Sequence, residues 1–285
     1  MSNRPAGMFV TDLDGTLLRS DRTLSSADVT ALERLGEAGI VRVIATGRVP
    51  FSFQRLMGDR KLPVDYLILS TGTGIIEYST NEILLSRGLA SDEAEAACME
   101  MTRLDLDFFV QGKFPENHRS RYRISGRDNP DFLRRLSFYN EFSSELPTGV
   151  PLSGPVSQMV AVVPAEDGIR AYRKVVGILG HDFSVVRTTS PLDGESLWIE
   201  VFPRDVSKGT AAAWLAERLG IGPCDTAAVG NDYNDLDLLG WAHRSYVVEN
   251  APEELSHGSM VVASNDESGV AMAVDHWLDA AGGLR

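Results

Sequence analysis

Short apolar runs alternate with amphipathic segments through the first seventy residues of the chain. The runs are Met8–Val10, Val41–Ala45 and Tyr66–Leu69. Their length and apolar character are typical of strands in a parallel sheet that is buried on both faces. Residues 26–38 carry apolar side chains at helical spacing before Gly39, and a second helix is expected through Leu56. The alternation predicts an α/β fold, with a doubly wound parallel sheet of the Rossmann-like kind.

The middle of the chain follows a different pattern, in which strands come in hairpin-like pairs. We expect helices over residues 94–104, 130–139 and 169–179, and strands over 107–111, 119–124, 156–163, 183–186 and 197–202. This α+β pattern predicts an inserted second domain over residues 85–203. After this domain, the alternation of strands and helices resumes. We expect a helix that Ser207 caps and Gly220 ends, and a last helix over 267–280. Between them we expect strands over 227–229, 247–248 and 260–262. The core domain is therefore predicted to be discontinuous, over residues 1–84 and 204–285.

Charge and cysteine content narrow the class of protein. The 27 lysines and arginines against 40 aspartates and glutamates give a net charge of −13 over 285 residues. Such a balance argues against a nucleic-acid partner, because that affinity depends on cations that neutralise phosphates. A small phosphorylated ligand stays possible, since a metal ion can reverse the field inside one cleft. We see neither an apolar leader nor a membrane-spanning run, and expect Cys98 and Cys224 to be reduced thiols in a cytoplasmic protein.

Two carboxylates follow the first predicted strand, in the sequence Asp12-Leu13-Asp14-Gly15-Thr16. A carboxylate can attack phosphorus and form an acyl phosphate, provided that a divalent cation offsets the charge repulsion. A second carboxyl group nearby can protonate the leaving oxygen and then deprotonate water. An aspartate before glycine is also common in an ordinary capped turn, so this segment alone leaves both interpretations open.

Three further segments carry polar groups at strand ends or helix starts. Thr46-Gly47-Arg48 offers a hydroxyl and a backbone N–H to a phosphate, or merely a helix cap. Lys208 begins a helix, where a cation is mildly unfavourable with the helix dipole, so it is either functional or a solvated surface residue. Residues 231–235 are rich in hard oxygen ligands that suit Mg²⁺, or form a solvated acidic turn.

Together, in this chain order, the four segments resemble the motifs of the haloacid dehalogenase-like superfamily. The likeness is greatest to its Cof-type branch, which carries a large inserted cap of the C2 type after the second motif. The matching segments are Asp12-Leu13-Asp14-Gly15-Thr16-Leu17, Ala45-Thr46-Gly47-Arg48, Val206-Ser207-Lys208-Gly209 and Gly230 to Asp235. The resemblance covers the whole chain in order, although the residues of the inserted domain match weakly.

The resemblance implies a role for each matching position. Asp12 would be the nucleophile and a metal ligand, and Asp14 the general acid/base that also gives its backbone carbonyl to the metal. Thr46 and Lys208 would hold the phosphoryl group. The remaining implied positions are Asn231 and Asp235 for Mg²⁺, and Gly15, Gly47, Arg48 and Asn234 for phosphate or substrate.

Two positions depart from the pattern of the branch. Asn231 stands where the family has an aspartate, so the metal ligand is either this amide or the next residue, Asp232. We favour Asn231, because a one-residue shift in so short a loop would turn its other side chains away from the cleft. Thr71-Gly72-Thr73 stands where the branch shows Asn-Gly-Ala, which leaves a substrate role for that segment open.

The resulting hypothesis is a Mg²⁺-dependent phosphatase that hydrolyses small phosphomonoesters, sugar phosphates first, through an aspartyl phosphate. Cations of the inserted domain could select the substrate. We expect at most one or two of Lys113, His118, Arg119, Arg121 and Arg123 to do so, and the others to be solvated strand residues. The alternatives are a phosphotransferase or phosphomutase of the same superfamily, and a catalytically weak binding or regulatory protein, which only Asn231 favours. We expect a monomer or homodimer with a small phosphorylated metabolite as its partner, and no membrane partner.

Overall fold

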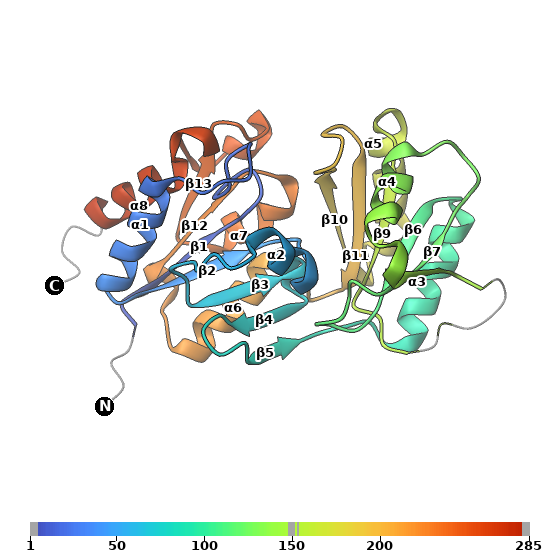
Figure 1. The fold of residues 1–285 in the computed structure, drawn as a ribbon, viewed down its shortest axis with the longest axis horizontal. Helices are drawn as coiled ribbons and strands as arrows, with labels where there is room; N and C mark the ends of the chain where they lie inside the picture. Colours follow the sequence, from blue (N-terminus) through green and yellow to red (C-terminus); the bar gives the residue numbers. More distant parts are fainter. Residues whose placement is uncertain (1–4, 148–151, 153, 281–285) are drawn as a thin grey trace. The chain divides into compact units, whose positions relative to one another are not determined.

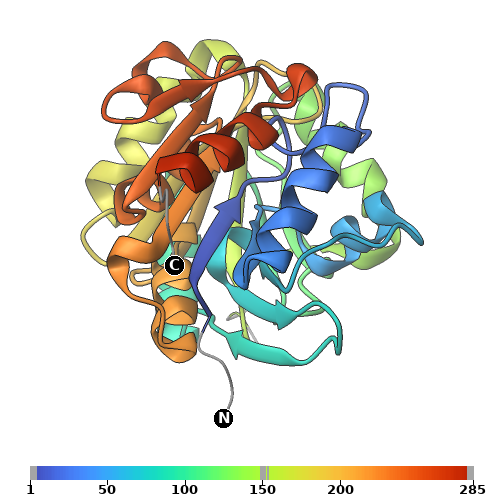
Figure 2. The same ribbon diagram turned by 90° about the vertical axis from the view of Figure 1, so that its left-hand side faces the viewer.

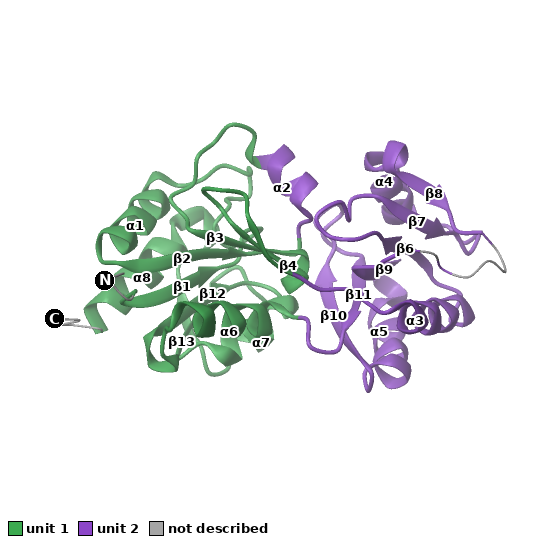
Figure 3. Ribbon diagram, turned by 90° about the horizontal axis from the view of Figure 1, so that it is seen from below, with its two compact units in different colours: residues 1–47, 57–85, 207–285 green, residues 48–56, 86–206 purple. Residues whose placement is uncertain are grey.

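A computed structural model describes residues 5–147, 152 and 154–280 of the protein. The chain forms two compact units (Figure 3). Unit 1 comprises residues 1–47, 57–85 and 207–285, and unit 2 comprises residues 48–56 and 86–206. A helix that follows the second strand, α2 (Pro50–Met57), thus packs mostly with unit 2 although it is close in sequence to the strands of unit 1.

Unit 1 is built on one twisted sheet, which has eight strands in the described part of the chain (Figure 1). Their order across the sheet is β14 (Met260–Val262), β13 (Arg244–Val248), β12 (Thr226–Gly230), β1 (Gly7–Thr11), β2 (Ile40–Ala45), β3 (Tyr66–Leu69), β4 (Gly74–Glu77) and β5 (Ile83–Ser86). The pairs from β14 to β3 are parallel, and β4 runs antiparallel to β3. The predicted doubly wound α/β fold is therefore confirmed.

Helices cover both faces of this sheet because its strands are apolar on both sides. Figure 2 shows α1 (Ser26–Glu37) and α8 (Gly269–Ala280) side by side on one face. There the ring of Phe9 on β1 lies 5.8 Å from that of Trp277 on α8. Met8 and Val10, which point the other way, pack in one buried cluster with Leu215 of α6 (Lys208–Leu219), and α7 (Leu236–Trp241) joins that face.

The predicted helix ends are set by local chemistry. The Ser207 hydroxyl accepts a hydrogen bond from the Thr210 N–H at 3.1 Å at the start of α6. Gly220 ends that helix with φ +71°, a left-handed conformation that glycine adopts at little cost. Gly39 has φ +73° just after α1 for the same reason. Both stops that the sequence predicted are confirmed.

Unit 2 carries a mixed sheet with six strands among the described residues. Their order is β10 (Phe183–Thr189), β11 (Leu197–Pro203), β9 (Gln158–Val163), β6 (Asp107–Gln111), β7 (Ser120–Arg123) and β8 (Ser143–Glu145). Helices α3 (Ser91–Arg103) and α5 (Ala165–Leu179) cover one face and form the larger core with it. Helix α4 (Pro130–Phe138) lies on the other face, where Phe132 stacks on Phe109 at 4.6 Å.

The sequence pattern gave no indication of strands β4 and β5, and it placed the start of α5 four residues late. Strand β5 is short and partly exposed at the edge of the sheet, so it lacks the buried apolar run of a central strand. The first turn of α5 carries Glu166 and Asp167, which favour the positive end of the helix dipole but break the apolar repeat. Within residues 5–147, 152 and 154–280, we find no helix with the length and apolar character that a membrane crossing needs.

Candidate active site

The polar residues that follow four strands of unit 1 share one edge of its sheet. Asp12 follows β1, Thr46 follows β2, Ser70 follows β3 and Asn231 follows β12. Because these strands are parallel neighbours, their carboxyl ends meet, which is where α/β sheets bind ligands. The sheet thus brings together segments that lie up to about two hundred residues apart in the chain.

Lys208 is the centre of this arrangement and is completely buried. Its Nζ donates to Oδ1 of Asp12 at 2.7 Å and to Oδ1 of Asp235 at 2.6 Å. A longer contact of 3.4 Å reaches Oδ1 of Asn234. The surface alternative for Lys208 is therefore wrong, and its cation at a helix start is stabilised by two carboxylates.

The buried charges shift each other's protonation. Burial disfavours the Lys208 ammonium, but the charges of Asp12 and Asp235 and their hydrogen bonds outweigh it and raise the pKa of Lys208. Burial raises the pKa of Asp12 to about 7, against the opposing effect of Lys208. The lysine thus stays protonated. A second positive charge near Asp12 would favour its ionised form when a bound ligand excludes water from the site.

Asp235 holds both the lysine and the loop that follows β12. Its Oδ2 accepts the backbone N–H groups of Asn231 at 2.9 Å and Asp232 at 3.1 Å. Gly230 permits this approach, since a Cβ there would lie 2.6 Å from the Asp235 side chain. Both oxygens of Asp235 thus have protein donors, and its predicted role as a metal ligand stays a prediction.

The side chain of Asn231 faces the first motif. Its amide oxygen accepts from the Thr16 hydroxyl at 3.1 Å. This amide oxygen also lies 3.2 Å from Oδ2 of Asp12 and 3.1 Å from the carbonyl oxygen of Asp14. Either the amide turns over and donates its N–H groups to these acceptors, or a cation lies among the oxygens.

This corner fits Mg²⁺ chemically, since a carboxylate, a carbonyl and an amide oxygen are the hard ligands that the ion prefers. No group of three His, Cys, Asp or Glu side chains among the described residues offers another metal site. The carboxylate of Asp232 instead accepts the Tyr233 N–H at 2.7 Å and caps a short 3-10 helix, η4 (Tyr233–Asp235). The geometry therefore favours Asn231 over Asp232 as the ligand.

Glycines let the motif segments come close to each other. Gly15 has φ +76°, and a Cβ there would lie 2.5 Å from Nδ2 of Asn231. A Cβ on Gly47 would lie 3.5 Å from the Thr71 hydroxyl and 3.8 Å from Nδ2 of Asn234. Thr46 itself is 1% exposed. The Asn234 amide thus borders both Gly47 and the Lys208 ammonium group.

Comparison with known proteins identifies the family. The haloacid dehalogenase-like hydrolase family matches the chain over residues 9–274. The chain belongs to this family. The resemblance that the motifs indicated is therefore confirmed, and the family makes the chain a hydrolase.

Its curated relatives are phosphatases, in agreement with the predicted phosphoric monoester hydrolase. One is 5-amino-6-(5-phospho-D-ribitylamino)uracil phosphatase YwtE of Bacillus subtilis, 28% identical over 94% of this chain and 96% of that protein. Another is HMP-PP phosphatase of Klebsiella pneumoniae, 28% identical over 94% of both chains.

Solved structures share the fold. BT1666 of Bacteroides thetaiotaomicron, a phosphatase of this superfamily, superposes with a TM-score of 0.75 at 20% identity, over 97% of this chain and 96% of that one. The subclass IIB sugar phosphatase BT4131 superposes with a TM-score of 0.75 at 18% identity, over 95% of this chain and 98% of that one.

Sequence reasoning missed several residues that hold this hydrolase site in place. Oδ2 of Asp237 accepts the Gly209 N–H at 2.8 Å, which fixes the turn that carries Lys208. Nδ2 of Asn250 donates to the carbonyl oxygen of Gly15 at 2.9 Å. Asn250 comes shortly after β13, so its position after another parallel strand was the feature that could have indicated it.

The segment after β3 packs against this edge of the sheet, while the substrate role that the departure at Thr71-Gly72-Thr73 left open stays open. Thr71 has φ +54°, an uncommon conformation for a residue with a side chain, and its N–H donates to the Thr46 carbonyl at 3.0 Å. Gly72 has φ +104°, and a Cβ there would lie 2.2 Å from the Ser207 carbonyl oxygen. This contact ties the segment to the start of α6, next to Lys208.

The predicted site residue Arg48 lies in unit 2, at the start of the segment that leads into α2. Of the five cations considered for substrate selection, Arg123 pairs with Asp105 at 3.1 Å and Arg119 lies over the Phe142 ring. His118 stacks on Phe51, with ring centroids 4.6 Å apart. Lys113 is exposed.

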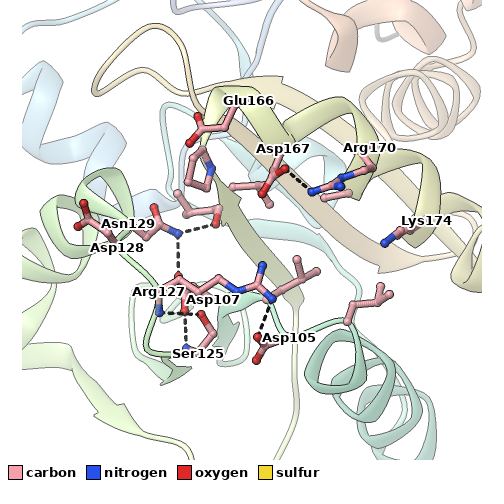
Figure 4. A pocket seen from close by; sticks show the side chains of 16 residues that line it. Asp105, Asp107, Ser125, Arg127, Asp128, Asn129, Glu166, Asp167, Arg170 and Lys174 are labelled. Atoms are coloured by element: carbon pink, nitrogen blue, oxygen red, sulfur yellow. Dashed lines mark hydrogen bonds and ion pairs between the residues drawn. The ribbon is translucent and has the colours of Figure 1, made fainter.

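Unit 2 also contains a cavity of about 270 Å³, whose lining includes Asp105, the partner of Arg123 (Figure 4). Two ion pairs join four of the charged side chains in this lining. Arg127 pairs with Asp105, and Arg170 pairs with Asp167. Asp107 accepts the Ser125 N–H and the amide of Asn129 at 2.8 Å. We assign this cavity a structural role, the anchoring of the start of α4.

Proposed function

We propose that the protein is a Mg²⁺-dependent phosphatase that hydrolyses small phosphomonoesters through an aspartyl phosphate on Asp12. The observation that carries the proposal is the buried contact of Asp12 with Lys208 next to three converging oxygens. A nucleophilic carboxylate, a fixed cation and a place for a second cation are what phosphoryl transfer needs.

The proposed reaction gives each of these groups one role. A carboxylate oxygen of Asp12 attacks phosphorus, and the alcohol leaves with a proton from Asp14. Asp14 then removes a proton from water, which attacks the phosphorus, releases phosphate and restores Asp12. Lys208 and Thr46 hold the phosphoryl oxygens throughout. Mg²⁺, held by Asp12, the Asp14 carbonyl and Asn231, would supply the charge that lets two anions approach.

We further propose that unit 2 acts as the inserted specificity domain and that sugar phosphates are the first substrates to test. The relatives support this class, since YwtE and BT4131 act on a ribityl phosphate and on sugar phosphates by their names. The two free cysteines, Cys98 and Cys224, are consistent with the reducing cytoplasm as its location. A monomer or homodimer stays our expectation.

The test is phosphate release from p-nitrophenyl phosphate and a panel of phosphometabolites with Mg²⁺. We expect turnover that EDTA stops and that Mg²⁺ restores, and none from Asp12→Asn. A trapped anion such as beryllofluoride should bind at Asp12. Absence of turnover across the panel would favour a binding or regulatory protein, and transfer of the phosphoryl group to a second alcohol in preference to water would show a phosphotransferase.

A further inference from the structure

The sheet of unit 1 holds Asp12 directly, whereas Asp14 lies beyond it. The Asp12 N–H donates to the Val229 carbonyl oxygen at 2.9 Å, and Oδ1 of Asp12 accepts from Lys208. Asp14 follows past the last residue pairs that join β1 to β2 and β12, and its backbone is bridged to Leu18. The position of Asp14 therefore depends on the segment that contains Leu18.

Residues 15–24, the first-motif arm, fold back on themselves after Asp14. Leu18 is bridged to Leu24 in antiparallel pairing, and the Arg19 N–H donates to the Thr23 carbonyl oxygen at 2.9 Å. Residues 20–23 at the tip of the arm are exposed. Because a short two-stranded hairpin is marginally stable by itself, the arm needs contacts with other elements to keep one position.

Two asparagine side chains from the last part of the chain supply such contacts. Nδ2 of Asn265 donates to the Leu18 carbonyl oxygen at 2.9 Å, and Asn265 is 4% exposed. Nδ2 of Asn250 donates to the Gly15 carbonyl oxygen at 2.9 Å. The two asparagines are joined as well, because the backbone N–H of Asn265 donates to Oδ1 of Asn250 at 2.9 Å. Since a carbonyl oxygen only accepts and a backbone N–H only donates, both amides are fixed with their NH₂ groups toward the arm.

The next residue, Asp266, holds the arm beyond Leu18. Its Oδ1 accepts the Ser20 N–H at 2.9 Å, and its Oδ2 accepts the Ser20 hydroxyl at 2.7 Å. Its carbonyl oxygen accepts from Nη2 of Arg19 at 2.9 Å. Asn265 and Asp266 belong to one short 3-10 helix, η6 (Asn265–Glu267), which thus contacts three successive residues of the arm. The contact of Asn265 is buried whereas those of Asp266 are exposed, so the loss of the asparagine should cost more.

We infer that Asn265, together with Asn250, is a positioning residue for the general acid/base, because it holds the first-motif arm in the place from which Asp14 reaches the leaving oxygen. The inference rests on the proposed phosphatase function. A general acid must lie within hydrogen-bond reach of the atom that it protonates, and a misplacement of about 1 Å can cost on the order of a hundred-fold in rate. Asp12 keeps its contacts with the sheet and with Lys208 when an asparagine is removed, so the loss falls on the step that needs Asp14.

The experiment compares phenyl phosphate with p-nitrophenyl phosphate, which have similar shapes but differ in how much the leaving group needs a proton. The value of kcat/KM covers the steps up to release of the alcohol, before water attacks. Asn265→Ala should lower kcat/KM about ten-fold for phenyl phosphate and about two-fold or less for p-nitrophenyl phosphate. Asn250→Ala, at an exposed residue, should change the ratio of the two values in the same direction and keeps the test open should Asn265→Ala not fold. Ile221→Ala, in the apolar cluster on the α6 face of the sheet, is the matched control for lost stability and should leave that ratio unchanged.

Equal losses for the two esters in the asparagine variants would mean that these contacts are only structural, and would overturn the inference. A change of the ratio in Ile221→Ala as large as in Asn265→Ala would overturn it too. If wild type released phosphate from neither ester, the proposed function would fail. Hydrogen exchange of the backbone amides would then decide the inference alone. Exchange that is about ten-fold faster over residues 13–20 in Asn265→Ala, and unchanged there in Ile221→Ala, supports it, whereas unchanged exchange in Asn265→Ala or equal acceleration in both variants overturns it.

Discussion

Substituting Asn231 by aspartate changes one group at the corner where the first and fourth motifs meet. The amide oxygen there lies 3.2 Å from Oδ2 of Asp12 and 3.1 Å from the Asp14 carbonyl oxygen. Without a cation, the amide can satisfy these acceptors by turning its N–H groups toward them. An ionised carboxylate has no such option, so Asn231→Asp makes the corner depend on a cation.

The magnitude follows from that distance. Two like unit charges 3.2 Å apart repel by about 5 kcal/mol at an effective dielectric near 20. In the metal-free protein, part of this cost is avoided by protonation, since burial already raises the pKa of Asp12 to about 7. A divalent cation reverses the sign of the interaction, while its lost hydration opposes binding. The net gain is about 1–3 kcal/mol, the usual worth of a charged hydrogen-bonded group, or roughly ten-fold or more in affinity.

Mg²⁺ titration by calorimetry and thermal unfolding measure the two sides of this prediction. We expect Asn231→Asp to bind Mg²⁺ at least ten-fold more tightly and to need less Mg²⁺ for half-maximal hydrolysis of p-nitrophenyl phosphate. Its Tm without metal should fall below that of wild type, and the rise in Tm on adding Mg²⁺ should be larger. Asp232→Asn is the matched control and should bind Mg²⁺ within two-fold of wild type, because the Asp232 carboxylate is engaged with the Tyr233 N–H.

The reverse pattern would refute the reasoning. If Asn231→Asp left both Mg²⁺ affinity and metal-free Tm unchanged while Asp232→Asn lost Mg²⁺ binding, Asp232 would hold the metal. A fall in Tm with no gain in affinity would show that the corner is a structural contact and no ligand site.

Three further predictions concern other parts of unit 1. Asp12→Asn should abolish turnover and leave the circular dichroism spectrum unchanged. Asp14→Asn should slow the release of a poor leaving group far more than the release of p-nitrophenol. Steady-state kinetics on one ester of each kind would check this difference. Asp28 is fully buried, and burial raises its pKa to about 6. Between pH 4 and 6 the folded state therefore keeps a proton that the unfolded state loses. The free energy of unfolding consequently falls as the pH rises through that range. Asp28→Asn should therefore raise the free energy of unfolding by about 1–2 kcal/mol at pH 7.5 and by little at pH 4, and an equal gain at both pH values would contradict this cause. Gly72→Ala places a Cβ 2.2 Å from a backbone carbonyl oxygen at φ +104° and should lower Tm by several degrees and kcat/KM together; a variant with wild-type Tm would contradict the close approach.

Much of the fold could be predicted from local pattern alone. Continuous apolar runs identified the central strands, and the serine before Lys208 and the glycine after Leu219 identified both ends of α6. These features depend on neighbours within a few residues, so the sequence carries them in full. The motif carboxylates could be placed at strand ends for the same reason.

Tertiary structure decided which of these residues meet. The burial of Lys208 between Asp12 and Asp235 depends on the neighbouring positions of β1 and β12, which the sequence pattern does not encode. The grouping of α2 with unit 2 and the pairing of Gln111 with Gln158 likewise depend on contacts between segments far apart in the chain. Local spacing determined what each segment is, whereas sheet order and register, set by long-range packing, determined which groups face one another.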